Sequence, residues 1–268
     1  SDHQRAADYT LAKGKLGKVE AAVGLIVSAL ILFGGLSRMW NFTAPLADMP
    51  VLREVALVTL LSVVTGVISI PFSYFSTFNI EEKFGFNKTT RATFWADLVK
   101  GTLLSAALML PLAALVFWLM RSAGPLWWLY AWLVFIGFQL LMLALYPTFI
   151  APLFNKFTPL QEGETKTAIE GLLARTDFAS NGLFVMDGSK RSAHGNAYFT
   201  GFGKAKRIVF FDTLLERLTN NEIVAVLAHE LGHFKRKHIV KRIVFMAIAS
   251  LAFLGAVAWV LPQPWFYT

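Results

Sequence analysis

The stretch Thr219–His238 reads TNNEIVAVLAHELGHFKRKH and contains the motif H-E-x-x-H, formed by His229, Glu230 and His233. On an α-helix, residues four positions apart project from nearly the same side, so both histidines can reach one metal ion. Glu230 lies one position away, where a carboxylate can accept the proton of an attacking water molecule. The motif therefore predicts a zinc-dependent hydrolase, with His229 and His233 as metal ligands and Glu230 as the catalytic base.

The residues around the motif predict a helix independently. Thr219 and Glu222 have the spacing of a capping box, which marks a helix N-terminus. Apolar residues then recur at helical spacing, at Ile223, Val226, Leu227, Leu231 and Phe234. The motif therefore lies in the structural context that its chemistry requires.

The composition is that of a polytopic membrane protein. Hydrophobic residues make up 56% of the 268 residues, charged residues make up 16%, and the mean hydropathy is +0.54. The chain contains no cysteine, which excludes disulfides, thiol catalysis and Cys-ligated zinc. A bound metal must therefore be held by histidine and carboxylate.

Five apolar runs are long enough to cross about 30 Å of hydrocarbon. They lie at Val19–Leu36, Val55–Tyr74, Gly101–Met120, Leu126–Tyr146 and Ile243–Leu261. Pro111 predicts a kink in the third run, and Gln139 predicts an interhelical hydrogen bond in the fourth. Trp127, Trp128 and Trp132 are typical of an interfacial aromatic belt.

The basic residues are distributed unevenly between the loops. Residues 1–18, 75–100 and 147–242 carry 22 of the 25 Lys and Arg residues, and the opposite side carries Arg38, Arg53 and Arg121. The positive-inside rule therefore places the three basic segments on the cytoplasmic side. The net charge of +8 then reflects topology, and we do not expect nucleic-acid binding.

Residues 147–242 form the one loop that is long enough for a folded soluble unit. Residues 164–175 have a helical pattern. Three further segments have strand patterns, the last two joined as a hairpin across Gly201–Gly203: Gly182–Met186, Asn196–Thr200 and Arg207–Phe211. A short sheet beside the motif helix can accept an extended peptide as an additional strand.

These features predict a mainly α fold, consisting of a polytopic membrane bundle with a small α+β zinc-metalloprotease domain. That domain combines a gluzincin-like H-E-x-x-H helix with a short β-sheet. The predicted parts are a transmembrane region with four spans and cytosolic loops, a cytosolic zinc-protease domain and a fifth transmembrane span, at residues 1–146, 147–242 and 243–268.

Several sequence blocks resemble the CAAX prenyl protease type I family, which is related to the HtpX-like proteases. The blocks are FNIEEKFGFNKTT at 78–90, YPTFIAPLFNKFTPL at 146–160, DGSKRSAHGNAYFTGFGKAKRIVFFDTLL at 187–215 and VLAHELGHFKRKH at 226–238. The resemblance implies a membrane zinc endopeptidase that removes a C-terminal tripeptide from isoprenylated substrates. It also implies that Asn196 lies near the bound substrate strand.

The resemblance assigns one Zn²⁺ to the full-length protein, with His229 and His233 as two of its ligands. A catalytic zinc site normally has three protein ligands, and the family's third ligand is a glutamate well downstream of the motif helix. We expect this glutamate beyond Thr268, and hence that the chain is an internal fragment of a longer protease. Glu222 is an internal alternative on the same helix as the histidines.

Two further histidines have other interpretations. His194 fits a surface turn at least as well as a substrate contact. His238 follows His233 by five residues, about 140° around a helix, and with its basic neighbours it fits an anchor for the last span.

Three other functions were weighed against the prenyl protease. An intramembrane protease would need the motif within a span, which the polar Asn220 and Asn221 and the basic FKRKH run disfavour. A quality-control protease of the HtpX type would use the same site on other membrane proteins. A catalytically inactive membrane fragment or scaffold would lack the third zinc ligand.

The expected partners are a peptide or protein substrate, prenylated or not, and the lipid membrane. The sequence leaves the oligomeric state open. The expected location is integral to the membrane, with the catalytic domain on the cytoplasmic side of a bacterial inner membrane or of the endoplasmic reticulum in a eukaryote.

Overall fold

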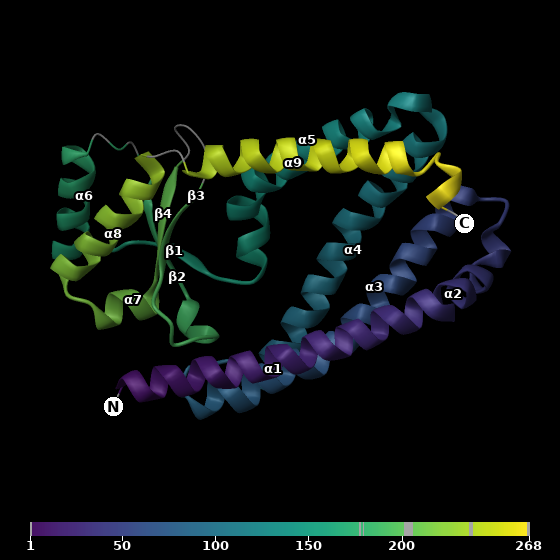
Figure 1. The fold of residues 1–268 in the computed structure, drawn as a ribbon. Helices are drawn as coiled ribbons and strands as arrows, with labels where there is room; N and C mark the ends of the chain where they lie inside the picture. The colour runs from purple at the N-terminus through teal and green to yellow at the C-terminus, as the bar shows by residue number, and fades with distance from the viewer. Residues whose placement is uncertain (1, 177, 179, 201–205, 236–237, 267–268) are drawn as a thin grey trace. The chain divides into compact units, whose positions relative to one another are not determined.

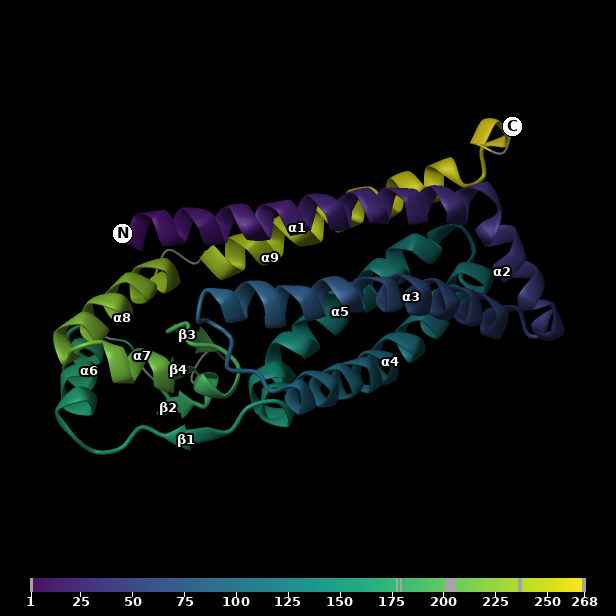
Figure 2. The same ribbon diagram turned by 90° about the horizontal axis from the view of Figure 1, so that it is seen from below.

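The computed structural model describes residues 2–176, 178, 180–200, 206–235 and 238–266. By its internal contacts the chain divides into two units, Ser1–Ser122 and Ala123–Thr268. Figures 1 and 2 label the elements of both units. The sequence predicted a different division, into membrane-spanning and soluble parts with boundaries at residues 146 and 242. That division stays a prediction.

The regular elements described in the first unit are all helices or helical turns. Its elements are α1 (Asp2–Leu30), the π-helical turn η1 (Ile31–Gly35), α2 (Leu36–Phe42), the 3₁₀ turn η2 (Ala44–Leu46), α3 (Pro50–Phe75), the π-helical turn η3 (Ser76–Glu81) and α4 (Arg91–Ser122). Helices α3 and α4 pack against each other. An ion pair between Arg121 and Glu54 joins one end of this helix pair, and the rings of Tyr74, Phe78 and Phe94 cluster at the other.

The break in the first helical segment lies at a glycine rather than at a proline. Phe33 and Gly34 have non-helical backbone angles, and Gly34 has a φ of 144°, a conformation that glycine adopts at little cost. Pro71 and Pro111 lie inside α3 and α4, which continue as helices on both sides of them. Helix α4 is thus continuous through Pro111, so the kink predicted there stays a prediction, and the observed break in a helical segment is at Gly34.

The second unit contains the remaining helices and all the described strands. Its elements are η4 (Gly124–Leu126), α5 (Trp127–Leu145), η5 (Tyr146–Ile150), η6 (Ala151–Leu153), β1 (Phe157–Pro159), α6 (Glu164–Arg175), β2 (Leu183–Met186), η7 (Gly188–Lys190), β3 (Ala197–Thr200), β4 (Arg207–Phe211), α7 (Asp212–Arg217), α8 (Asn220–Lys235), α9 (His238–Val260) and η9 (Pro264–Phe266).

Five helical segments are long and apolar enough to cross a membrane, at Gln4–Phe42, Pro50–Glu81, Arg91–Ser122, Gly124–Leu153 and Val240–Val260. These segments confirm the number and positions of the five predicted spans. Each is longer than the apolar run that predicted it, because the helices continue into polar sequence beyond the apolar core.

Helices α5 and α9 lie side by side in the second unit (Figure 1). The Trp132 indole Nε1 donates a hydrogen bond to the Ala247 carbonyl oxygen at 2.9 Å, and Gly255 lies beside the Trp128 ring. Gln139, which the sequence predicted to bond between helices, has no hydrogen-bond partner among the described residues. The interhelical bond comes instead from Trp132, one of the residues predicted to form an aromatic belt.

The strands form one sheet in the order β1-β2-β4-β3. Strand β3 pairs antiparallel with β4, which confirms that the two predicted hairpin strands are neighbours; the connecting residues 201–205 lie outside the described part of the chain. The sequence did not predict the parallel pairing of β2 with β4, nor β1, which pairs antiparallel with β2. Strand β3 is therefore one edge of the sheet.

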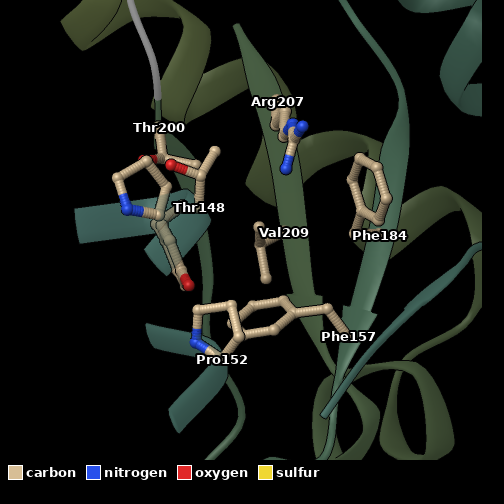
Figure 3. A pocket seen from close by; sticks show the side chains of 9 residues that line it. Thr148, Pro152, Phe157, Phe184, Thr200, Arg207 and Val209 are labelled. Carbon is tan, nitrogen blue, oxygen red and sulfur yellow. The ribbon is translucent and has the colours of Figure 1, made fainter. Parts of the chain in front are cut away.

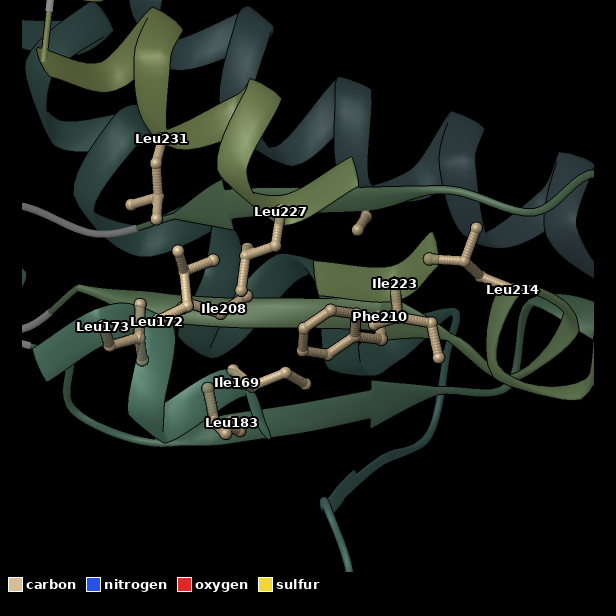
Figure 4. Packing of buried hydrophobic residues seen from close by; sticks show 11 residues of the cluster. Ile169, Leu172, Leu173, Leu183, Ile208, Phe210, Leu214, Ile223, Leu227 and Leu231 are labelled. Carbon is tan, nitrogen blue, oxygen red and sulfur yellow. The ribbon is translucent and has the colours of Figure 1, made fainter. Parts of the chain in front are cut away.

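Helices α6 and α8 cover one face of this sheet and enclose its hydrophobic core (Figure 4). Leu227 and Leu231 extend from α8 toward Ile208 and Phe210 of β4. Phe210, Ile208 and Leu227 are fully buried, and each such side chain contributes about 1.5–3 kcal/mol through apolar burial. This core fixes the position of the motif helix on the sheet.

We predict that Phe210→Ala destabilises the second unit by about 3–5 kcal/mol, because the deletion leaves a cavity between α8 and the sheet. Proteolysis during urea unfolding in detergent would measure the change in the free energy of unfolding. Phe149→Ala is the matched control, because Phe149 is 67% exposed. Equal effects of the two substitutions would contradict the assigned core.

Candidate active site

Helix α8 carries the H-E-x-x-H motif and presents its two sides to different surroundings. Ile223, Leu227 and Leu231 are at most 2% exposed and pack into the core. His229 is exposed, because it lies on the side of the helix away from these residues. Burial of the apolar stripe therefore determines the direction in which the motif faces.

The N-terminus of α8 is capped by Thr219 and Glu222. Both the backbone N–H and the hydroxyl of Thr219 donate hydrogen bonds to Glu222 Oε2, each at 2.8 Å. The backbone bond, followed by the hydroxyl bond, lowers the pKa of the Glu222 carboxyl from its ordinary value. The cap therefore stabilises the helix at neutral pH, and this contribution is lost as the pH falls through and below the ordinary glutamate range near 4.5.

Glu222 is poorly placed to be the third metal ligand. It precedes His229 by seven residues, which is about 10 Å along a helix axis. Its Oε2 atom is also engaged by Thr219. The structure therefore gives Glu222 a capping role, which agrees with the spacing that predicted the capping box.

The motif helix carries residues that can bind a metal ion, but the described side chains do not form a complete ligand set. Glu230 and His233 belong to α8, but their side chains lie outside the described part of the chain. Two histidines four residues apart on one helix are the ligand pattern typical of zinc hydrolases, and His229 lies on the exposed side of α8. Within the described residues, no three His, Asp or Glu side chains gather to hold a metal ion.

Helix α8 also lies against the edge strand β3. Asn196 is exposed and immediately precedes this strand. Its carbonyl oxygen accepts the Phe211 N–H at 2.9 Å, and its side-chain Oδ1 accepts the Ala197 N–H at 2.9 Å. The motif helix thus lies beside the edge strand. A peptide that pairs with this edge would therefore lie near the motif.

The two other histidines lie on different elements from the motif. His194 is exposed in the loop before β3, and its carbonyl oxygen accepts a hydrogen bond from the Thr213 hydroxyl at 2.9 Å. His238 begins α9 rather than continuing α8, and its side chain lies outside the described part of the chain. The position of His238 at the start of the last spanning helix agrees with its predicted place near the membrane.

A small hollow of about 70 Å³ lies on the face of the sheet opposite to α8 (Figure 3). Phe184, Val209 and Arg207 point into it from β2 and β4, and Pro152 closes one side. The Arg207 guanidinium lies 5.2 Å from the centre of the Phe184 ring. Because α8 packs on the other face, this hollow is separated from the motif by the sheet.

Tyr198 also lines this hollow. Burial, with a smaller effect of Tyr146, raises the pKa of the Tyr198 phenol to about 12. The phenol is therefore neutral at physiological pH and remains a hydrogen-bond donor.

Sequence reasoning did not identify the residue that joins the segment after α5 to the sheet. Arg191 donates from Nη1 to Asn155 Oδ1 at 2.8 Å and from Nη2 to the Phe154 carbonyl at 2.7 Å. Asp187 accepts the Lys156 N–H at 2.7 Å. Both contacts join segments more than 30 residues apart, and an isolated charged residue in a turn gives no local signal for such a pairing.

Comparisons with known proteins identify the family. Residues 1–156 match the family described as "CAAX prenyl protease N-terminal, five membrane helices", and residues 159–263 match peptidase family M48. The chain belongs to peptidase family M48. This finding confirms the resemblance inferred from the sequence, and it implies that this M48 chain is an integral membrane protein of a metal-dependent peptidase family.

Two curated relatives are similar to the M48 chain over much of its length. The "CAAX prenyl protease 1 homolog" of Arabidopsis thaliana is 41% identical over 260 residues, which is 94% of this chain and 61% of the relative. The "CAAX prenyl protease 1" of Saccharomyces cerevisiae is 43% identical over 198 residues, which is 73% of this chain and 43% of the relative. The M48 chain thus spans less than two thirds of the length of these relatives.

The crystal structure of S. mikatae Ste24p is similar to the M48 chain, with a TM-score of 0.90 and 34% identity. The similarity covers 97% of this chain and 62% of the Ste24p chain. It confirms the predicted fold class, a mainly helical membrane bundle combined with a small sheet.

We expect His229→Ala to reduce the metal bound by the full-length M48 protein from about one ion per chain to background, because it removes an imidazole ligand. Glu222→Gln should keep the metal, because the amide can still accept the bonds from Thr219. Elemental analysis of purified protein measures both variants. Loss of metal in Glu222→Gln would show that Glu222 is a ligand.

Proposed function

We propose that this chain forms the membrane spans and the zinc-binding helix of an endopeptidase that removes the C-terminal tripeptide from CAAX-type prenylated proteins. One observation carries the proposal: the H-E-x-x-H motif lies on a helix whose apolar side is buried, whose His229 is exposed, and which packs beside an edge strand. Membership of family M48 supports the same activity.

The proposed metal is zinc, held by His229 and His233. A third protein ligand completes a catalytic zinc site, and we assign it to a glutamate beyond Thr268 in the full-length protein. This assignment agrees with the greater length of the curated relatives. Zinc, when bound, acidifies water and polarises the scissile carbonyl.

The proposed role of Glu230 is proton transfer. Its carboxylate accepts a proton from the attacking water and later delivers that proton to the nitrogen of the leaving amine. The adjacent histidines hold the metal, so acid–base chemistry and metal binding come from neighbouring positions of one helix. This arrangement requires no further titratable group on α8.

The proposed substrate position is the free edge of β3, where an extended peptide can pair with the strand. Asn196 lies immediately before this strand and is exposed, so we assign it a contact with the peptide backbone. Because α8 packs against β3, a peptide on this edge lies beside the motif helix.

We predict that Glu230→Gln lowers cleavage of a prenylated CAAX peptide by about 10²–10⁴-fold, because it removes the proton acceptor. The variant should still bind zinc, since the two imidazoles remain. Release of the tripeptide by the full-length protein in lipid nanodiscs measures the first effect, and elemental analysis measures the second.

Glu216→Gln is the matched control, because Glu216 is an exposed residue of α7 and should leave cleavage unchanged. Full activity of Glu230→Gln would refute the assigned base. An unprenylated CAAX peptide and an unfolded casein-like substrate separate the prenyl protease from a quality-control protease, which would cleave the casein-like substrate equally well.

We also propose that the soluble part of the second unit faces the cytoplasm. The uneven distribution of Lys and Arg supports this orientation. Of the three basic residues on the opposite side, two are engaged in local contacts: Arg53 lies 3.6 Å from the centre of the Trp40 ring, and Arg121 pairs with Glu54. The opposite side therefore carries few Lys and Arg residues that would retain it in the cytoplasm.

The lack of cysteine makes this orientation directly measurable. We predict that a membrane-impermeant maleimide labels Asp48→Cys from the non-cytoplasmic side of intact membranes. Glu216→Cys should be labelled only after permeabilisation. Both positions are exposed, so access of the reagent depends on sidedness alone, and the reverse labelling pattern would invert the proposed topology.

A further inference from the structure

The beginning of α1 is fastened to the segment that follows α3. The Tyr9 hydroxyl donates to Glu81 Oε1 at 2.7 Å, and the Lys13 ammonium lies 2.9 Å from the same oxygen. The Tyr9 ring also meets the rings of Phe84 and Phe86 edge-on, with centroids 5.4 and 5.1 Å away. These contacts hold α1 beside η3 within the first unit.

A groove of about 610 Å³ lies next to these contacts, between α1 and the end of the second spanning segment. Its volume is within the range of pockets that hold small molecules, about 300–1,000 Å³. Most of its lining is apolar: Ala12, Leu16, Val19, Phe75, Ile80 and Phe84. Asn79, Lys15 and Lys83 supply the polar part of the lining.

The two lysines of the groove are not paired with the described carboxylates nearby, and the Lys83 ammonium lies 5.8 Å from the centre of the Phe84 ring. Glu81 is engaged by Lys13 and Tyr9, and Glu82 accepts a hydrogen bond from Asn87 Nδ2 at 2.6 Å. Lys15 and Lys83 are exposed, and neither forms an ion pair with any described residue. Two ammonium groups therefore remain available to a ligand in the groove.

The position of the groove indicates which ligand these groups meet. Lys15 precedes the apolar run that begins at Val19, and Lys83 follows the spanning segment that ends at Glu81. Lys15 therefore precedes the apolar part of the first spanning segment and Lys83 follows the second, at the levels where lipid headgroups are found. Leu16, Val19 and Phe75 continue the groove toward the apolar parts of those segments. Basic pockets between spanning helices bind anionic lipid headgroups.

We propose that this groove is a binding site for a phospholipid with an anionic headgroup. The lipid phosphate lies between the ammonium groups of Lys15 and Lys83, and an acyl chain follows Leu16, Val19 and Phe75. A bound lipid of this kind would fill the space beside the contacts of Tyr9 and reinforce the attachment of α1. The site belongs to the first unit and does not depend on the proposed peptidase activity.

The test is native mass spectrometry of the full-length protein in detergent, titrated with phosphatidylglycerol or with phosphatidylcholine. We expect the protein to retain phosphatidylglycerol preferentially. Lys15→Gln and Lys83→Gln should each weaken its binding about five-fold, and the double variant about 25-fold, from the usual contribution of a lysine near an anionic lipid. Lys88→Gln is the charge-matched control, because Lys88 is exposed but does not line the groove.

A second variant separates occupation of the groove from attraction to surface charge. Ala12→Trp should fill the groove and release phosphatidylglycerol while leaving both lysines in place. The paired replacement of Lys15 and Lys83 by arginine should preserve binding, because the charge is retained. Size-exclusion profiles and thermal stability confirm that each variant is folded.

Three results would overturn the proposal. The first is equal retention of the two lipids, and the second is an effect of Lys88→Gln as large as those of the groove lysines. The third is unchanged lipid binding in folded Ala12→Trp protein, which would mean that lipid adheres to exposed charge rather than occupying the groove.

Discussion

Burial of one side of α8 is the constraint on which the arrangement of the second unit depends. Ile223, Leu227 and Leu231 pack into one core with residues of the sheet, α6 and α7, and together they fix the rotation of the helix. A rotation that exposed these residues would cost several kcal/mol, since each apolar side chain contributes about 1.5–3 kcal/mol on burial. The direction of His229 is therefore a consequence of hydrophobic packing, and the chemistry of the motif follows from it.

The first unit uses polar contacts for a comparable purpose. Glu81 accepts hydrogen bonds from Tyr9 and Lys13, and these contacts determine where α1 lies along η3. Helices in a bilayer gain little from hydrophobic attraction to one another, so packing and hydrogen bonds have to set their positions. The Trp132–Ala247 bond between α5 and α9 is another case, in which a side-chain donor meets a backbone carbonyl.

Local sequence patterns predicted much of the fold. Helix 164–175 and strand Arg207–Phe211 have the predicted bounds, because periodicity and turn residues act over a few positions. Strand β1 was missed, since the strand character of Phe157–Pro159 depends on pairing with β2. The parallel pairing of β2 with β4 and the groove beside α1 depend on contacts between distant residues, which one sequence does not reveal.

In the candidate site, too, the local features were predicted and the long-range contacts were not. The sequence located the motif helix and its cap correctly, because both depend on spacing within one helix. The distance of Glu222 from the histidines along the helix and its bond from Thr219 both favour a capping role for this carboxylate over a role as a metal ligand. The role of Asn196 depends on what binds beside β3, and it stays a prediction.

The break between α1 and α2 has a consequence for sequence variation. A Cβ atom at Gly34 would have no neighbouring atom within 4 Å, so space does not prevent a larger residue there. The barrier to replacement is the backbone conformation, with φ at 144°. At Gly35 the barrier is space, because a Cβ would lie 3.0 Å from the Leu30 carbonyl oxygen. Two adjacent glycines thus resist replacement for unrelated reasons, backbone conformation at Gly34 and a close approach at Gly35.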